Sequence, residues 1–150
     1  MTVELVGTVR STLENTDHPY MQGAWRPTFN EWNAIFANGD AEVIGTIPDD
    51  IDGVYVRTGE VPVHEPIGRY HPFDGDGFIH SISFKGGRAS YRSRFVRTKA
   101  FQAEQEAGKA LWAGLMEPPH KSTRPGWGAQ EWLKDSSSTD VVIHAGKILS

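Results

Sequence analysis

The clearest pattern in the sequence is an alternation of side chains with a period of two on both sides of a glycine pair. In residues 78–84, Phe78, His80, Ile82 and Phe84 fall on one face, and Ile79, Ser81 and Ser83 fall on the other. Residues 89–96 repeat the alternation after the turn sequence KGGR at 85–88. Because a period of two is the signature of a strand, these residues predict a β-hairpin.

Other parts of the chain predict shorter strands. Residues 54–57 and 141–144 are rich in β-branched and aromatic side chains, which favour strands, and a turn at 145–147 leads into a further strand at 148–150. Residues 58–68 contain Gly59, Pro62 and Pro66 and predict a loop. Residues 1–40 combine aromatics with proline and asparagine without a clean period. We interpret them as an extended aromatic arm that lies on a larger body.

One segment has helical periodicity instead. Between residues 99 and 115 apolar side chains recur every three to four positions, at Ala103, Ala107, Ala110, Leu111 and Leu115. Thr98 suits the N-cap position, whereas Gly108 weakens the helix by about 1 kcal/mol relative to Ala. Prolines at 118, 119 and 125 predict a loop after the helix.

Composition narrows the class of protein. The 150 residues, 38% hydrophobic and 23% charged, fit one domain. A net charge of −4 argues against a nucleic-acid binder, which usually carries a basic excess. The absence of cysteine excludes disulfides, iron–sulfur clusters and thiolate zinc sites. Any metal would therefore need His, Asp or Glu ligands.

The sequence has no run of about 18 apolar residues that could span a membrane, and residues 1–10 do not resemble a secretory signal. We expect a cytoplasmic protein with no transmembrane segment.

Candidate metal ligands cluster around two Asp-Gly pairs. Asp74 and Asp76 could bind calcium, but the loop lacks the distal Glu of an EF-hand, so a structural turn is the preferred interpretation. His71, His80 and His144 could bind iron or zinc. The alternatives are a capping role for His71 and a core position for His80. No pair of histidines has the i, i+4 spacing of a helical metal site.

Other candidate chemistry is weaker. Residues 136–139 are rich in hydroxyls but lack the Gly-x-Ser-x-Gly elbow of a serine hydrolase, so a polar turn is preferred. No glycine motif predicts phosphate binding. A basic group near the hairpin is expected to be a solvated face and consists of Arg88, Arg92, Arg94 and Arg97. The residues alone predict a β-rich module without a complete catalytic constellation.

Four segments, in order, resemble the N-terminal part of the carotenoid cleavage oxygenase family, which includes the lignostilbene dioxygenases. They are residues 43–57 (VIGTIPDDIDGVYVR), 70–80 (YHPFDGDGFIH), 94–98 (RFVRT) and 135–147 (DSSSTDVVIHAGK). The second is highly specific, and the likeness covers about residues 20–150.

The resemblance implies an all-β fold, part of a seven-bladed β-propeller with a helical insertion, and a chain truncated relative to the whole enzyme. It divides residues 1–150 into the arm (1–40), strands (41–97), a helical insertion (98–116) and a loop with strands (117–150). The implied activity is oxidative cleavage of a carbon–carbon double bond by O₂ in a carotenoid, apocarotenoid or stilbene, giving two carbonyl products. It also implies peripheral contact with a membrane.

The implied cofactor is a non-haem Fe(II) held by four histidines. None of the family's iron ligands maps onto this sequence, and the first is expected beyond residue 150. His144 matches a position that is not a ligand, and His71 and His80 belong to a motif that is structural in the family. We therefore assign no catalytic, cofactor-binding or metal-binding residue to this chain, which is expected to be inactive by itself.

Two residues are candidates to contact an apolar substrate. Trp112 and Leu115 lie in or near the helical insertion, although core packing is the preferred interpretation for both. Leu115 stands near the position at which lignostilbene-cleaving relatives carry a phenol-binding Tyr.

Two further hypotheses remain open. The chain could be a non-catalytic binding or interaction module, or an independent metal-binding domain that uses His71, His80 and Asp76.

Overall fold

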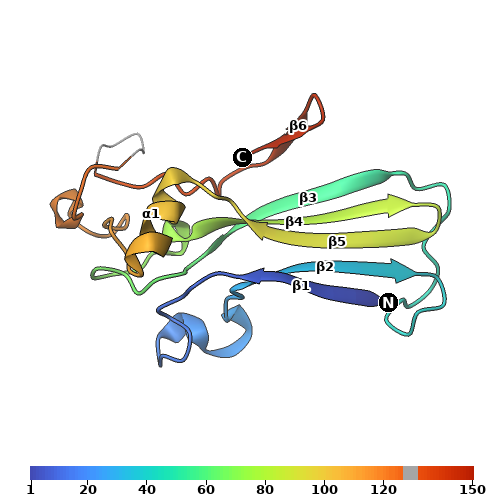
Figure 1. Cartoon of the computed structure of the whole chain (residues 1–150), viewed down its shortest axis with the longest axis horizontal. Coiled ribbons are helices and arrows are strands. Elements are labelled where there is room, and N and C mark those ends of the chain that lie inside the picture. Colours follow the sequence, from blue (N-terminus) through green and yellow to red (C-terminus); the bar gives the residue numbers. More distant parts are fainter. Residues whose placement is uncertain (127–131) are drawn as a thin grey trace.

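A computed structural model describes residues 1–126 and 132–150 of the chain. Five strands form one antiparallel sheet in the order β1-β2-β5-β4-β3, and two more form a separate hairpin, β6-β7 (Figure 1). The strands are β1 (Thr2–Thr8), β2 (Asn30–Ala37), β3 (Gly53–Val61), β4 (Asp76–Lys85), β5 (Arg88–Phe95), β6 (Val142–His144) and β7 (Lys147–Leu149). The helix is α1 (Lys99–Ala107), and the 3-10 turns are η1 (Pro19–Met21), η2 (Gly23–Trp25), η3 (Pro72–Asp74) and η4 (Pro119–Lys121). The prediction of a mostly β fold with one helical segment is confirmed.

The predicted hairpin is formed by β4 and β5. Ile82 pairs with Tyr91 and Lys85 pairs with Arg88, so the turn occupies the two glycines between them. Gly86 and Gly87 have φ angles of 52° and 67°. A two-residue turn with both φ angles positive matches the twist of the flanking strands, which is why the Gly-Gly pair identified this hairpin. The hairpin β6-β7 was likewise predicted and is confirmed.

Two segments of the predicted arm are instead strands of the sheet. β1 pairs with β2 from Thr2–Ile35 to Thr8–Asn30, with a bulge between Leu5 and Gly7, and β2 pairs with β5. Strand β3 also continues through residues 58–61, which were predicted to be loop, and it ends where Pro62 removes a backbone donor. The pairing partners lie up to about 60 residues away in the chain, so local pattern did not reveal these strands.

Helix α1 is shorter than the predicted 99–115. Thr98 caps its start, with the hydroxyl oxygen accepting a hydrogen bond of 3.0 Å from the N–H of Phe101. Gly108 ends it in the left-handed conformation (φ 66°) and donates its N–H to the carbonyl of Glu104. Gly108 is therefore a helix terminator rather than a weak interior residue, because glycine adopts positive φ without strain.

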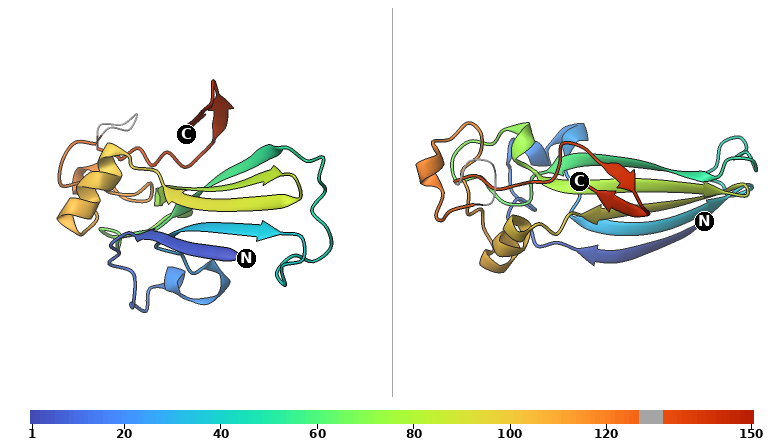
Figure 2. Two further views of the ribbon diagram at one scale, coloured as in Figure 1. Left: turned by 45° about the vertical axis from the view of Figure 1, so that its right-hand side comes forward. Right: turned by 90° about the horizontal axis from the view of Figure 1, so that it is seen from above.

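The core lies at one end of the sheet, where α1 and the segments around residues 9–29 and 62–64 meet it (Figures 1 and 2). Its eight buried members are Val9, Leu13, Met21, Phe29, Val63, Phe78, Phe95 and Phe101. The opposite end of the sheet projects away from these elements (Figure 2) and carries exposed apolar side chains such as Val3 and Tyr55. Within the described residues, no helix is long and apolar enough to cross a membrane.

Candidate functional site

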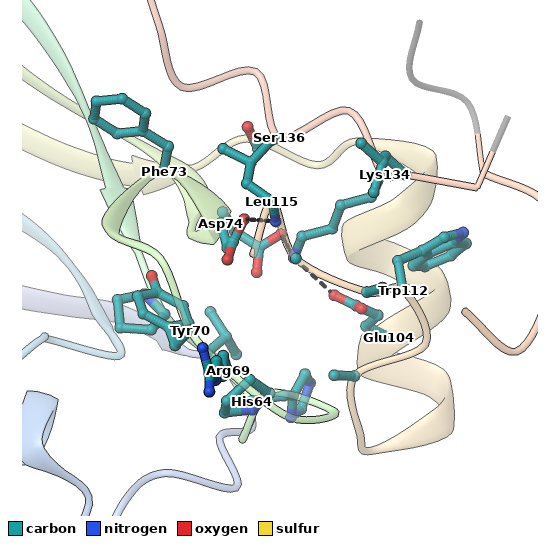
Figure 3. Close-up of a pocket in the computed structure, with 18 residues that line it drawn as sticks. His64, Arg69, Tyr70, Phe73, Asp74, Glu104, Trp112, Leu115, Lys134 and Ser136 are labelled. Atoms are coloured by element: carbon teal, nitrogen blue, oxygen red, sulfur yellow. Dashed lines mark hydrogen bonds and ion pairs between the residues drawn. The ribbon is translucent and has the colours of Figure 1, made fainter. Parts of the chain in front are cut away.

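A cavity of about 190 Å³ lies at the core end of the molecule, between η3, α1 and the segments that follow β3 and α1 (Figure 3). Its polar lining consists of His64, Arg69, Tyr70, Asp74, Asp76, Glu104, Lys134 and Ser136. Its apolar lining includes Phe73, Trp112 and Leu115. Apolar walls with a few converging polar groups are typical of a small-molecule site, so this cavity is the candidate site.

A buried ion triad forms part of this lining. The Lys134 Nζ atom lies 2.9 Å from Oδ1 of Asp76 and 2.9 Å from Oε2 of Glu104 (Figure 3). Asp76 is 3% exposed and Glu104 is 2% exposed. The second oxygen of Glu104 accepts the N–H of Leu111 at 2.8 Å. The triad therefore connects the start of β4, the middle of α1 and the segment after residue 132.

Burial and charge act against each other within the triad. Burial opposes the charge of Lys134, but the two carboxylates together raise its pKa above the usual value. Burial also raises the pKa of Asp76, and the Lys134 ammonium only partly offsets this. Lys134 is thus a fixed cation whose ion pairs are occupied by protein carboxylates.

Two more polar residues line the cavity. Burial lowers the pKa of His64, which favours the neutral imidazole. Burial raises the pKa of Tyr70, whose buried hydroxyl has no hydrogen-bond partner among the described residues. The Tyr70 ring packs edge-on against Tyr20, with ring centroids 4.4 Å apart. Tyr70 is therefore a neutral phenol at the cavity.

The two residues predicted to contact an apolar substrate differ in their environment. Trp112 is buried against Ala100 and Leu111, so the core-packing interpretation is confirmed, and it also lines the cavity. The guanidinium of Arg124 lies 5.0 Å from the centre of its ring. Leu115 is 55% exposed, so core packing was the wrong expectation for this residue. Its position at the cavity leaves it able to contact a ligand.

The segment with the two Asp-Gly pairs is a structural turn, which is the interpretation that the sequence favoured over a calcium site. His71 and Asp74 form a capping box around η3, in which the N–H of Phe73 donates to Nδ1 of His71 and the N–H of His71 donates to Asp74. Asp74 also accepts the N–H of Leu115 at 2.8 Å. Both carboxylate oxygens of Asp74 are therefore occupied by backbone donors.

The remaining metal candidates do not come together. Nδ1 of His80 lies 2.8 Å from the Tyr91 hydroxyl on the sheet, His144 is exposed in β6, and Asp76 belongs to the triad. Within residues 1–126 and 132–150, no group of three or more His, Asp or Glu side chains could hold a metal ion. The independent metal-domain hypothesis has no geometric support in these residues.

The other polar candidates have structural partners. The Ser136 and Ser138 hydroxyls lie 2.9 Å apart, and the Ser136 carbonyl accepts the N–H of Gly77 at 2.9 Å, which fits the polar-turn interpretation. Arg94 donates to Asn33 at 2.7 Å and Arg97 donates to Glu31 at 2.8 Å. Two of the four arginines thus fasten β5 and its following segment to β2.

Comparison with known proteins shows which protein family the chain resembles. Residues 26–150 match the retinal pigment epithelial membrane protein family. The chain is 44% identical over 144 residues to carotenoid 9,10(9',10')-cleavage dioxygenase 1 of Phaseolus vulgaris, covering 89% of this chain and 26% of that protein. It is 34% identical over 137 residues to the carotenoid cleavage oxygenase of Mycobacterium tuberculosis, covering 90% and 24%.

Comparison with solved structures points to the same family. A Pseudomonas brassicacearum lignostilbene dioxygenase superposes with a TM-score of 0.68 at 22% identity, over 88% of this chain and 26% of that chain. Cobalt-substituted Synechocystis ACO superposes with a TM-score of 0.58 at 31% identity, over 79% and 24%. The fold is therefore part of the carotenoid oxygenase propeller.

The chain belongs to the retinal pigment epithelial membrane protein family, whose matched relatives are carotenoid cleavage oxygenases. This confirms the resemblance seen in the four sequence segments. The chain spans about a quarter of the length of the Phaseolus and Mycobacterium relatives.

Proposed function

We propose that this chain is the N-terminal portion of a non-haem Fe(II) dioxygenase that cleaves a carbon–carbon double bond of a carotenoid, apocarotenoid or stilbene. Insertion of both atoms of O₂ would break the double bond and give two carbonyl products. The observation that carries this proposal is the 44% identity over 144 residues to a plant carotenoid 9,10-cleavage dioxygenase. Similarity to an enzyme named resveratrol cleavage oxygenase 1, from Chaetomium globosum, is the reason to include stilbenes.

The candidate histidines of this chain are not arranged to bind an iron ion together. His71 is the N-cap of η3, and His80 and His144 lie on β4 and β6, so each of the three candidate histidines has the separate environment given above. No metal-dependent step is therefore assigned to them. Under the proposal, the four histidines that hold iron lie beyond residue 150.

The chain's own contribution would be a wall of the substrate cavity. Trp112, Phe73 and Leu115 offer an apolar surface to a polyene or stilbene. The ion triad would hold α1 beside β4 and so keep this wall in place. Because both carboxylates are already paired with Lys134, the triad can fulfil this role without a ligand.

The test is oxygenase activity of the full-length protein that carries this sequence. We expect the iron-loaded protein to cleave at least one of three probes, a C40 carotenoid, an apocarotenoid or resveratrol. In ¹⁸O₂, each carbonyl product should carry one labelled oxygen by mass spectrometry. The 150-residue chain alone should give no product above background. A full-length protein that binds no iron and cleaves none of the probes would favour the non-catalytic binding module, which lacks the iron ligands, instead.

We also propose peripheral membrane contact through the exposed apolar side chains beside the cavity. Phe73 is 63% exposed, Leu115 55% and Met116 58%. Burying a side chain of this size in an apolar phase is worth about 1.5–3 kcal/mol. The paired change Phe73→Ser and Met116→Ser should therefore weaken sedimentation with phosphatidylcholine vesicles by about tenfold or more. The control Val54→Ser, an exposed position on edge strand β3, should bind like the parent. Equal binding of parent and double variant would exclude this surface.

A further inference from the structure

Three segments of the chain meet at His64, a residue that the sequence did not single out. His64 is 6% exposed and lines the cavity described above. Its ring contacts Thr12 on one side and Gln105 of α1 on the other. From this junction we propose that His64 is a proton-sensitive latch, which holds residues 10–12 against α1 when neutral and releases them when protonated. This inference does not depend on the proposed oxygenase activity.

The orientation of the Gln105 amide is fixed by the backbone of Arg10. The N–H of Arg10 donates to Oε1 of Gln105 at 3.0 Å, and Nε2 of Gln105 donates to the Arg10 carbonyl at 2.8 Å. If the amide were turned over, its NH₂ group would face the N–H of Arg10 and its oxygen would face the Arg10 carbonyl, so both bonds would be lost. Gln105 therefore presents its NH₂ group toward His64.

This orientation determines the protonation state of His64. Its Nε2 lies 3.2 Å from Nε2 of Gln105, so it must act as the acceptor. The proton of the neutral ring is then on Nδ1, which faces the Thr12 hydroxyl at 3.4 Å. The same hydroxyl oxygen accepts the N–H of Glu65 at 2.9 Å. A doubly protonated ring would direct an N–H at the Gln105 amide donor, which breaks the latch.

The charges around His64 have opposite effects on its protonation. Burial lowers the pKa of His64 the most, Lys134 and Arg10 lower it further, and Glu104 of α1 favours the imidazolium without reversing the shift. Asp76, on β4, also lines the cavity but is paired with Lys134. In the open state the imidazole is solvated and regains a pKa near 6.5. The closed state, in which residues 10–12 lie against α1, is therefore favoured above about pH 6.5. Its stability relative to the open state decreases as the pH falls below this value.

Opening would affect the helix and the cavity together. The Arg10 side chain donates to the carbonyls of Gln105 and Glu106, the latter at 3.2 Å, and so caps the last turn of α1. Movement of residues 10–12 away from α1 would break these bonds as well. Because His64 and Glu104 both line the cavity, protonation would loosen the wall to which α1 contributes.

Hydrogen exchange of the Arg10 and Glu65 amides tests the latch in the 150-residue chain. After correction for the intrinsic pH dependence, we expect their exchange to speed up by up to about tenfold per pH unit below pH 6.5. Amides of the β4–β5 hairpin should keep their protection, which distinguishes a local opening from global unfolding. In His64→Gln, Oε1 can accept from Gln105 without titrating, so the pH dependence should be lost. The control His144→Gln removes an exposed histidine and should leave it unchanged.

Imidazole nitrogen shifts measured by NMR give a second test that requires no variant. We expect the Nδ1–H tautomer of His64 above pH 7. The Nε2–H tautomer, or corrected exchange at Arg10 that does not change with pH in the parent chain, would overturn the proposal. The NMR test stands even if His64→Gln does not fold.

Discussion

Replacing Gly77 with Ala is expected to destabilise the fold by about 3 kcal/mol or more. A Cβ atom at this position would lie 2.3 Å from the carbonyl oxygen of Ser137 and 2.8 Å from that of Ser136. These are backbone atoms, which cannot move aside as the end of a flexible side chain can. The N–H of Gly77 also donates to Ser136 at 2.9 Å, and its carbonyl accepts from Val96 at 2.8 Å. Separation of the two backbones would weaken this network.

Chemical denaturation of the parent and variant chains measures this effect. Gly59→Ala is the matched control, because Gly59 also lies in a strand but a Cβ there would meet nothing within 4 Å. We expect the control to change the free energy of unfolding by no more than about 0.5 kcal/mol. A Gly77→Ala chain that is as stable as the control would show that residues 136–137 do not pack on the start of β4.

Gly77 illustrates what the sequence could and could not reveal. The two Asp-Gly pairs predicted a turn, and His71 with Asp74 do form one around η3. The second glycine is required for a different reason, which is the close approach of a segment about 60 residues later. Such an approach leaves no local pattern. It can be read only from the fold or from resemblance to a family that shares it.

In the secondary structure, too, the local features were predicted from the sequence and the long-range ones were not. The β4–β5 hairpin and the Thr98 cap were predicted because their signals are local, consisting of a period of two, a glycine turn and a capping hydroxyl. Strands β1 and β2 were missed because residues 2–8 and 30–37 pair across a long connection. The helix was predicted too long because Ala110, Leu111 and Leu115 continue its apolar period beyond Gly108. Leu111 faces the core from a loop instead.

The candidate site was the least predictable part. Glu104 lies outside the apolar period of residues 99–115, yet it is 2% exposed. Lys134 follows a proline-rich loop with no periodicity to indicate burial. Each of these charges is tolerated in the interior because the other members of the triad are beside it. That condition concerns three distant segments at once, so no single sequence window contained it.

Replacing Lys134 with Met should therefore destabilise the fold by about 3–5 kcal/mol at neutral pH. The change removes the cation 2.9 Å from both Asp76 and Glu104 and leaves two buried carboxylates facing each other. The surface pair Lys85–Asp52 provides the control, since its atoms are 3.8 Å apart and both side chains are largely exposed. Lys85→Met should change stability by less than about 1 kcal/mol. Thermal or urea unfolding at pH 7 measures both variants.

The pH dependence distinguishes an uncompensated charge from lost packing. Burial already raises the pKa of Asp76, and removal of the ammonium would raise it further. A carboxyl whose pKa is higher in the folded than in the unfolded chain destabilises the fold as the pH rises above its unfolded value of about 4. The loss of stability caused by Lys134→Met should therefore become smaller as the pH is lowered from 7 toward 4. A deficit independent of pH would mean that the methylene stem, and not the charge, stabilises the site. Adding Asp76→Asn and Glu104→Gln should recover most of the loss at pH 7, because no buried charge then remains unpaired.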